Sequence, residues 1–286
     1  MNDSLQVQRT YKNIAGFNLY QPTSIDEVCT HLAKFGENCV LMAGGIDLLQ
    51  ELKSGRRVDN LIYLKSVPEL SSIKVINDRV QVGACVTHRS LEINPIIQKH
   101  LPTLSNVWGD VGNIRVRVVG TIGGNILKND PNYDGLPAFA ALNSMASFKN
   151  ISGSHRVPVA SLSCDRPSGL LTNIEIPIKK KRVFSMDRTL KPIASIALSA
   201  EIDQNTIEGI RVVIGCAFST PVERQIMENL IISSDKLTEQ TEIITGKILE
   251  DLPEPLDNVF GSASYRRRII AVLLRRQLIS LAQIIR

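Results

Sequence analysis

The stretch 120-GTIGGNILKNDPNYDG-135 decides how this 286-residue chain is interpreted. It contains four glycines, three asparagines and two aspartates, and it follows an apolar run. A second glycine pair stands at 43-AGGID-47. Glycine has no Cβ, so its backbone turns tightly and can approach a ligand closely. Successive N–H groups in such a loop form a concave site for an anion. The two loops together therefore indicate a cradle for a diphosphate.

Neither loop matches a standard nucleotide-binding motif. The chain has no G-x-G-x-x-G dinucleotide fingerprint at these loops, and no G-K-S/T follows either of them, as it would in a P-loop. For one glycine pair taken alone, an ordinary tight turn or bulge is the more common explanation. The residues by themselves thus indicate a two-domain protein with a diphosphate cradle.

Length and composition are those of an ordinary globular protein. The length predicts two domains. Hydrophobic residues make up 43% of the chain and charged residues 21%, and the net charge is +5. The basic clusters 179-KKKR-182 and 266-RRR-268 are more commonly solvated faces than phosphate sites. We expect no nucleic-acid partner.

Residues that ligate metals show no useful spacing. No C-x-x-C pair occurs, so no local zinc or iron–sulfur signature exists, and we expect buried thiols in a reducing compartment. The cysteines are Cys29, Cys39, Cys85, Cys164 and Cys216, and the histidines are His31, His88, His100 and His155. For the histidines, surface or satisfied core positions are expected, and for Trp108 core packing. The chain contains no run of about 18 apolar residues, so no membrane span is predicted and a cytoplasmic location is expected.

The order of predicted elements places a boundary near 178–184. Strands are predicted at 39–43, 58–64, 73–78, 79–87, 115–125, 171–178, 193–202 and 207–217. The strands at 73–78 and 79–87 are predicted to form a hairpin that turns at Asn77-Asp78. Helices are predicted at 23–35, 47–53, 89–100, 104–112, 220–230, 234–249 and 263–286, and 136–150 begins as a helix and continues as a strand. A mixed α/β domain therefore precedes a smaller α+β domain.

Several segments, in their order, carry a resemblance to a known family. They include 17-FNLYQPTSIDEV-28, 42-MAGGIDLLQELKSG-55, 116-VRVVGTIGGNI-126, 130-DPNYDGLPAFAALN-143 and 264-SYRRRIIAVLLRR-276. Together they span nearly the whole chain. They resemble the FAD-binding medium subunit of the molybdenum hydroxylases, the xanthine dehydrogenase and carbon monoxide dehydrogenase family.

The resemblance implies an α+β fold with two domains. Residues 1–180 would form an FAD-binding domain of the vanillyl-alcohol-oxidase (PCMH) type, with subdomains at about 12–67 and 68–180. Residues 181–286 would form a C-terminal domain of the CO dehydrogenase flavoprotein type, with a three-stranded antiparallel sheet and a helical bundle. Electrons would pass from iron–sulfur clusters of a partner through FAD to NAD, oxygen or quinone.

The resemblance also assigns site residues. The two glycine loops would hold the FAD diphosphate through backbone N–H groups, and an aspartate and a strand leucine would help to hold the cofactor. By position these residues are Ala43, Gly44, Gly45, Ile46, Asp47, Thr121, Gly123, Gly124, Asn125, Asp134 and Leu171.

The chain departs from the family pattern in its side chains. Ile46 stands where a small polar residue is usual, so a hydroxyl donor is missing. Lys128 and Asp130 replace an asparagine and a serine; the lysine would add positive charge near the diphosphate and the aspartate would oppose it. The other departures are Val118 for an asparagine, Ser185 for a lysine and Pro192 for an aspartate, while Arg188 and Ala194 of the last motif are retained. We expect FAD to bind with altered affinity or reactivity.

The implied partners are a molybdopterin-binding large subunit and a small subunit with 2Fe-2S clusters, in a heterotrimer or a dimer of heterotrimers. Two alternatives stay open. One is a degenerate member that has lost flavin and acts as a structural or assembly subunit. The other is a stand-alone FAD oxidoreductase, which would need another electron donor because this chain carries no cluster ligands.

Overall fold

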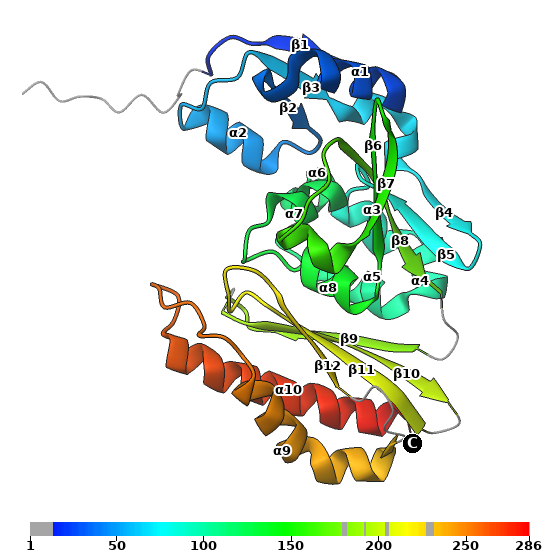
Figure 1. The fold of residues 1–286 in the computed structure, drawn as a ribbon, viewed down its shortest axis with the longest axis vertical. Helices are drawn as coiled ribbons and strands as arrows, with labels where there is room; N and C mark the ends of the chain where they lie inside the picture. Colours follow the sequence, from blue (N-terminus) through cyan, green and yellow to red (C-terminus); the bar gives the residue numbers. More distant parts are fainter. Residues whose placement is uncertain (1–13, 179–181, 192, 204–205, 227–231, 286) are drawn as a thin grey trace, which may run out of the picture.

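The structure is a computed structural model that describes residues 14–178, 182–191, 193–203, 206–226 and 232–285. These residues form three parts stacked along the long axis of the molecule (Figure 1). A small N-terminal part lies at one end, a central part with most of the helices follows, and a sheet covered by two helices closes the other end. No helix among the described residues is both long and apolar enough to span a membrane.

The N-terminal part is a parallel sheet with helices beside it. Its elements are β1 (Asn18–Tyr20), α1 (Ile25–Phe35), β2 (Cys39–Met42), α2 (Ile46–Lys53) and β3 (Asn60–Tyr63), and the strand order is β1-β3-β2. The predicted start of α1 is confirmed: the Ser24 side chain accepts from the Glu27 N–H, and the Glu27 carboxylate accepts from the Thr23 N–H.

The central part is a five-stranded sheet with a group of short helices. Its elements are β4 (Ile73–Ile76), β5 (Arg79–Gly83), α3 (His88–Ile93), α4 (Pro95–His100), α5 (Pro102–Gly109), α6 (Ile114–Val119), α7 (Ile122–Lys128), α8 (Gly135–Ala141), β6 (Met145–Asn150), β7 (Gly153–Pro158) and β8 (Leu170–Pro177). The strand order is β4-β5-β8-β6-β7. The predicted hairpin is confirmed, since Asn77 and Asp78 take φ values of 45° and 56° between β4 and β5.

The strand predicted over 115–125 is wrong. This segment consists of α6, Gly120 and α7. Alternating arginine and valine favoured a strand. Two side-chain caps decide otherwise: the Asn113 side chain accepts from the Val116 N–H, and the Thr121 hydroxyl accepts from the Gly124 N–H. The second glycine loop is therefore a junction between two short helices and does not follow a strand.

The C-terminal part is an antiparallel sheet covered by two helices. Its elements are β9 (Arg182–Arg188), β10 (Ser195–Asp203), β11 (Thr206–Gly215), β12 (Val222–Ile226), β13 (Ile232–Ser233), α9 (Ser234–Glu250) and α10 (Ala263–Ile285). The order is β12-β11-β10-β9, with β13 also paired to β11, so the sheet is larger than the expected three strands. The helix predicted at 220–230 is wrong over 222–226, where β12 pairs with β11; residues 227–231 lie outside the described residues, as do 179–181 of the first basic cluster.

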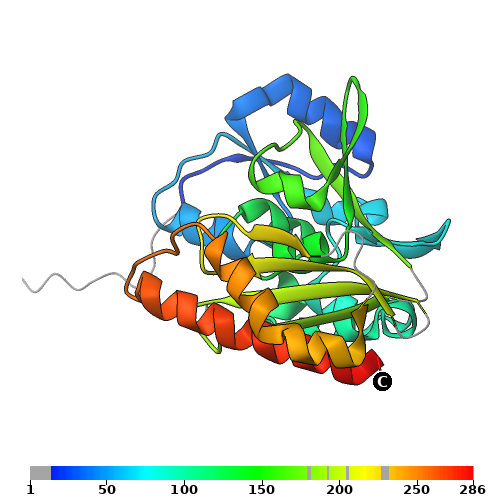
Figure 2. The same ribbon diagram turned by 60° about the horizontal axis from the view of Figure 1, so that its bottom comes forward.

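The C-terminal sheet packs on both faces. Along β10, Ile196, Leu198 and Ala200 lie in one core with residues of α9 and α10. Ala197, which points to the opposite face, belongs to the core of the central part, and Ser199 donates to the Ala141 carbonyl of α8. The two helices lie along one face of the sheet (Figure 2). Because its side chains point alternately to the two faces of the sheet, β10 joins the C-terminal helices to the central part.

One arginine of the 266–268 cluster is a buried structural residue. Arg266 is 1% exposed, so the solvated-face prediction is wrong for it. Its guanidinium donates to the carbonyls of Ile193 and Cys216 at 2.6 and 2.8 Å and to the Asn258 side chain at 2.7 Å. The single side chain thereby joins the end of β11 to two neighbouring loops.

We predict that Arg266→Met lowers the free energy of unfolding by about 3 kcal/mol, because it leaves buried carbonyls without donors. Arg268→Met is the matched control: Arg268 is exposed, so the change should stay within about 0.5 kcal/mol. Urea unfolding of both variants measures the difference. Equal losses would contradict the structural role of Arg266.

Candidate cofactor site

The two glycine loops meet backbone to backbone. A Cβ built on Gly44 would overlap the carbonyl oxygen of Val119 and would lie 3.1 Å from the Cα of Gly120. Gly45 has a φ of 75° and precedes the first residue of α2. Gly44 is therefore required by close approach, and Gly45 by a left-handed conformation that favours glycine.

The first loop presents free backbone donors. In the part of the chain that the structure describes, none of the N–H groups of residues 44–47 has an acceptor. They lie at the N-terminus of α2, where N–H groups are unpaired and the helix dipole favours negative charge. A phosphate oxygen is a suitable acceptor for these groups.

The second loop has most of its donors already engaged. The N–H groups of Ile122 and Gly123 donate to the carbonyls of Val86 and Ala84 at 2.9 and 2.8 Å, and the Gly124 N–H donates to its cap, Thr121. A Cβ on Gly123 would lie 2.8 Å from the Ala84 carbonyl oxygen. This loop is thus held tightly against residues 84–88, and it offers fewer free N–H groups than the sequence predicted.

His88 lies behind the second loop. Its backbone N–H donates to the Gly120 carbonyl at 3.0 Å, and its ring Nδ1 accepts from the Trp108 indole at 2.9 Å. Burial lowers the pKa of His88 to about 4, and the nearby Arg117 guanidinium acts in the same direction. His88 and Trp108 are 3% and 0% exposed, so both are satisfied core residues, as predicted.

Two side chains reach from the 120–135 segment to α2. The Tyr133 hydroxyl donates to Asp47 Oδ1 at 2.7 Å, and the Lys128 ammonium forms an ion pair with Glu51. The positive charge of Lys128 is thus paired with Glu51, which was not among the predicted site residues. Asp130 accepts from the N–H of Asn132 in a local turn.

The remaining predicted site residues are buried or already have partners within the protein. Asp134 is 6% exposed and forms an ion pair with Arg188 of β9, which also donates to the Asp110 carbonyl. Burial raises the pKa of Asp134, although Arg188 acts in the opposite direction. Leu171 is 2% exposed within β8, and the Asn125 side chain accepts from the Gly135 N–H at the start of α8.

Apolar side chains are exposed beside the two loops. Leu49, on α2, packs against Gly45 and is 40% exposed. Ile114 and Val118 lie one turn apart on α6 and are 51% and 49% exposed. Such exposed apolar residues suit the flat rings of a dinucleotide cofactor next to its diphosphate.

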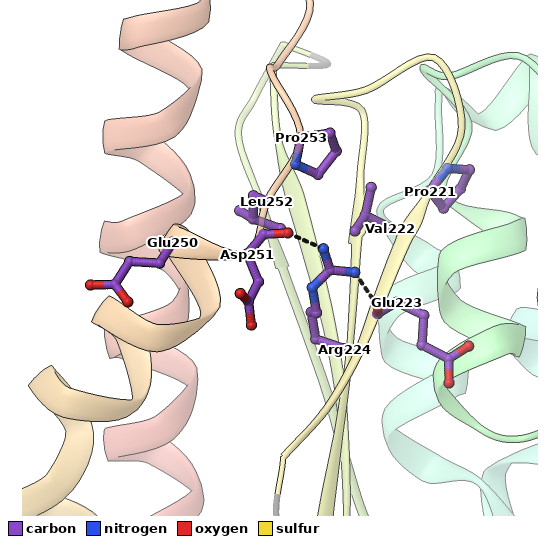
Figure 3. A pocket seen from close by; sticks show the side chains of 8 residues that line it. All are labelled: Pro221, Val222, Glu223, Arg224, Glu250, Asp251, Leu252 and Pro253. Carbon is purple, nitrogen blue, oxygen red and sulfur yellow. Dashed lines mark hydrogen bonds between the residues drawn. The ribbon is translucent and has the colours of Figure 1, made fainter.

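A surface depression lies elsewhere, on the C-terminal part. Pro221–Arg224 and Glu250–Pro253 line it, and Arg224 donates to the carbonyls of Glu223 and Asp251 across it (Figure 3). None of its lining residues belongs to the predicted site. The depression is therefore separate from the two glycine loops.

Two family profiles match the chain in succession. Residues 15–179 match the FAD binding domain in molybdopterin dehydrogenase. The chain belongs to this family. FAD is the cofactor that defines the family, and the family membership recognised from the sequence is confirmed. Residues 191–281 match the CO dehydrogenase flavoprotein C-terminal domain.

Characterised relatives match this FAD-binding chain along most of its length. The glyceraldehyde dehydrogenase medium chain of Sulfolobus acidocaldarius is 27% identical, over 90% of this chain and 95% of that protein. The carbon monoxide dehydrogenase medium chain of Hydrogenophaga pseudoflava is 23% identical, over 92% and 96%. The same fold occurs in the carbon monoxide dehydrogenase structure from H. pseudoflava, with a TM-score of 0.82 at 21% identity over 92% of this chain and 96% of that one. It also occurs in quinoline 2-oxidoreductase from Pseudomonas putida 86, with a TM-score of 0.81 at 22% identity over 95% and 98%. The predicted fold class is confirmed.

We predict that Gly44→Ala weakens FAD binding by at least about tenfold, because its Cβ would push the loops apart by displacing the Val119 carbonyl. Gly246→Ala in α9 is the matched control, since a Cβ there would meet nothing within 4 Å. Flavin fluorescence titration of both variants measures the effect. Wild-type affinity in Gly44→Ala would show that contact between the loops is not needed.

We also predict a pH dependence from His88. Its pKa is about 4 in the folded protein and about 6.5 when unfolded, so above pH 6.5 its contribution to stability is complete. As the pH falls from 6.5 to 4, the unfolded chain binds a proton that the folded one does not, and stability declines by about 3 kcal/mol. His88→Gln should flatten this decline, while the exposed His155→Gln should preserve it. Urea unfolding at several pH values provides the measurement, and an unchanged decline in His88→Gln would contradict the assignment.

Proposed function

We propose that this chain is the FAD-containing electron-transfer subunit of a molybdenum hydroxylase complex. It takes electrons from iron–sulfur clusters of a partner subunit and passes them through FAD to an external acceptor, which is NAD, oxygen or quinone. The observation that carries the proposal is the set of free N–H groups at the N-terminus of α2, in a chain that belongs to an FAD-binding family. When bound, FAD supplies the redox chemistry, and the protein supplies binding and orientation.

For the diphosphate we propose backbone contacts from residues 43–47, with Thr121, Gly123, Gly124 and Asn125 of the second loop shaping the site. The support is strongest for the first loop, whose donors are free. In the second loop Thr121 is 2% exposed, and its hydroxyl accepts from the Gly124 N–H, so it caps α7 and holds the shape of the loop. Gly123 and Asn125 fix the shape of that loop through Ala84 and Gly135.

We propose an indirect role for Asp134 and Leu171. Both are buried in the protein, and Asp134 already pairs with Arg188. Asp134 would hold the C-terminal sheet beside the cofactor site, and Leu171 would support the central sheet.

We also propose the division into two domains, residues 1–180 and residues 181–286, which the two successive family matches support.

For partners we propose a molybdopterin-binding large subunit and a small subunit with 2Fe-2S clusters, in a heterotrimer or a dimer of heterotrimers in the cytoplasm. The support is that several relatives are named as medium chains or medium subunits.

A second candidate function is that of a flavin-free structural subunit. Ile46 in the first loop and the engaged N–H groups of the second loop favour it.

We predict that the complex, purified with both partner subunits and reduced with dithionite, loses its oxidised-flavin absorbance. NAD, oxygen or ubiquinone should then restore that absorbance, because FAD lies between the clusters and the acceptor. The control is the same complex after its FAD has been removed, in which the clusters should still be reduced but should reoxidise slowly.

A wild-type complex that assembles but releases no FAD on denaturation would overturn the proposal in favour of the structural role. Equal reoxidation rates with and without FAD would exclude electron transfer through this subunit.

A further inference from the structure

Helix α2 carries the free donors of the cradle but is weakly packed. Of its eight residues only Leu52 is buried. Figure 1 shows α2 at the edge of the N-terminal part, where it faces the 120–135 segment. A helix with so little buried surface needs further contacts to keep a defined position, since burial of apolar surface is the main force that holds helices.

Two polar contacts supply the missing restraint. Tyr133 bonds to Asp47 in the first turn of α2, and Lys128 pairs with Glu51 one turn further along. Both begin on the segment that carries the second glycine loop. Lys128 lowers the pKa of Glu51, and Glu51 raises the pKa of Lys128, so both groups are charged at neutral pH.

We propose that Tyr133 and Lys128 are positioning residues for FAD. They hold α2 in the orientation in which the N–H groups of residues 44–47 converge on the diphosphate. Positioning before binding lowers the entropic cost of binding, so these contacts act on cofactor affinity. The inference rests on the proposed placement of the diphosphate at this loop.

The same contacts add little to global stability. The Lys128 and Glu51 side chains are 34% and 32% exposed, and ion pairs at the surface contribute weakly to folding. Loss of the Lys128 contact should therefore alter FAD binding without altering the thermal midpoint of the FAD-free chain. A purely structural role would show the reverse pattern.

The test is a fluorescence titration of the FAD-free full chain with FAD. Tyr133→Phe and Lys128→Met should each weaken binding about fivefold, the change expected for loss of one intramolecular contact. Arg56→Met is the matched control. Arg56 also pairs with Glu51, but it follows α2 directly in the chain and does not bridge to the 120–135 segment. Its loss should leave FAD affinity unchanged.

Charge reversal provides a rescue. Glu51→Lys and Lys128→Glu should each weaken FAD binding. In an Arg56→Met background, where residue 51 no longer meets Arg56, the double variant should recover most of the loss, because the pair is restored with its charges exchanged. Hydrogen–deuterium exchange of the α2 amides in the FAD-free chain is the second measurement. It should be faster in Tyr133→Phe and Lys128→Met than in wild type or Arg56→Met.

The outcomes separate the two proposals. If the wild type binds FAD, Gly44→Ala weakens binding, and the Tyr133 and Lys128 variants bind normally, the inference is overturned and the proposed function stands. If the wild type binds no FAD, the proposed function fails and so does the role toward FAD, and the exchange rates then show only whether the contacts restrain α2.

Discussion

The structure depends on one close approach, that of Gly44 to the carbonyl of Val119. This contact brings a loop of the N-terminal part against a loop of the central part with no side chain between them. Because a Cβ cannot fit there, the position requires glycine. The approach places the N-terminus of α2 beside Gly120, so the proposed anion site lies where two segments more than seventy residues apart in the chain meet. The cradle is thus a product of backbone packing, and side-chain chemistry only adjusts it.

Features with a local cause could be predicted from the sequence. The N-cap formed by Ser24 and the turn of Asn77 and Asp78 follow from neighbouring residues, and the structure contains both. The first glycine loop could also be placed, since an apolar strand precedes it and a helix follows. The prediction of buried thiols is correct for Cys29, Cys85 and Cys216 but wrong for Cys164, which is exposed. Family resemblance added the cofactor and the fold, which residue patterns alone did not reach.

The helices of the 115–125 segment were missed although their caps are local. The side chains of Asn113 and Thr121 each accept from an N–H group three residues further on, and the strand-like alternation outweighed that signal. Features that depend on distant partners could not be predicted. Whether Arg266 is solvated or buried depends on carbonyls 50 and 73 residues away. Tyr133 was missed as a site residue because its partner lies 86 residues earlier in the chain. In each case the decisive contact is absent from any local window of sequence.

Tyr133 and Asp134 are consecutive, yet they serve opposite ends of the molecule. The Tyr133 side chain reaches α2 in the N-terminal part, and Asp134 pairs with Arg188 in the C-terminal sheet. A single peptide unit therefore joins all three parts of the chain. An insertion or deletion in the segment between α7 and α8 would put the two anchors out of phase. The length of that segment is therefore fixed more strictly than its sequence. Conservation of length without conservation of sequence is the evolutionary signature that this junction should leave.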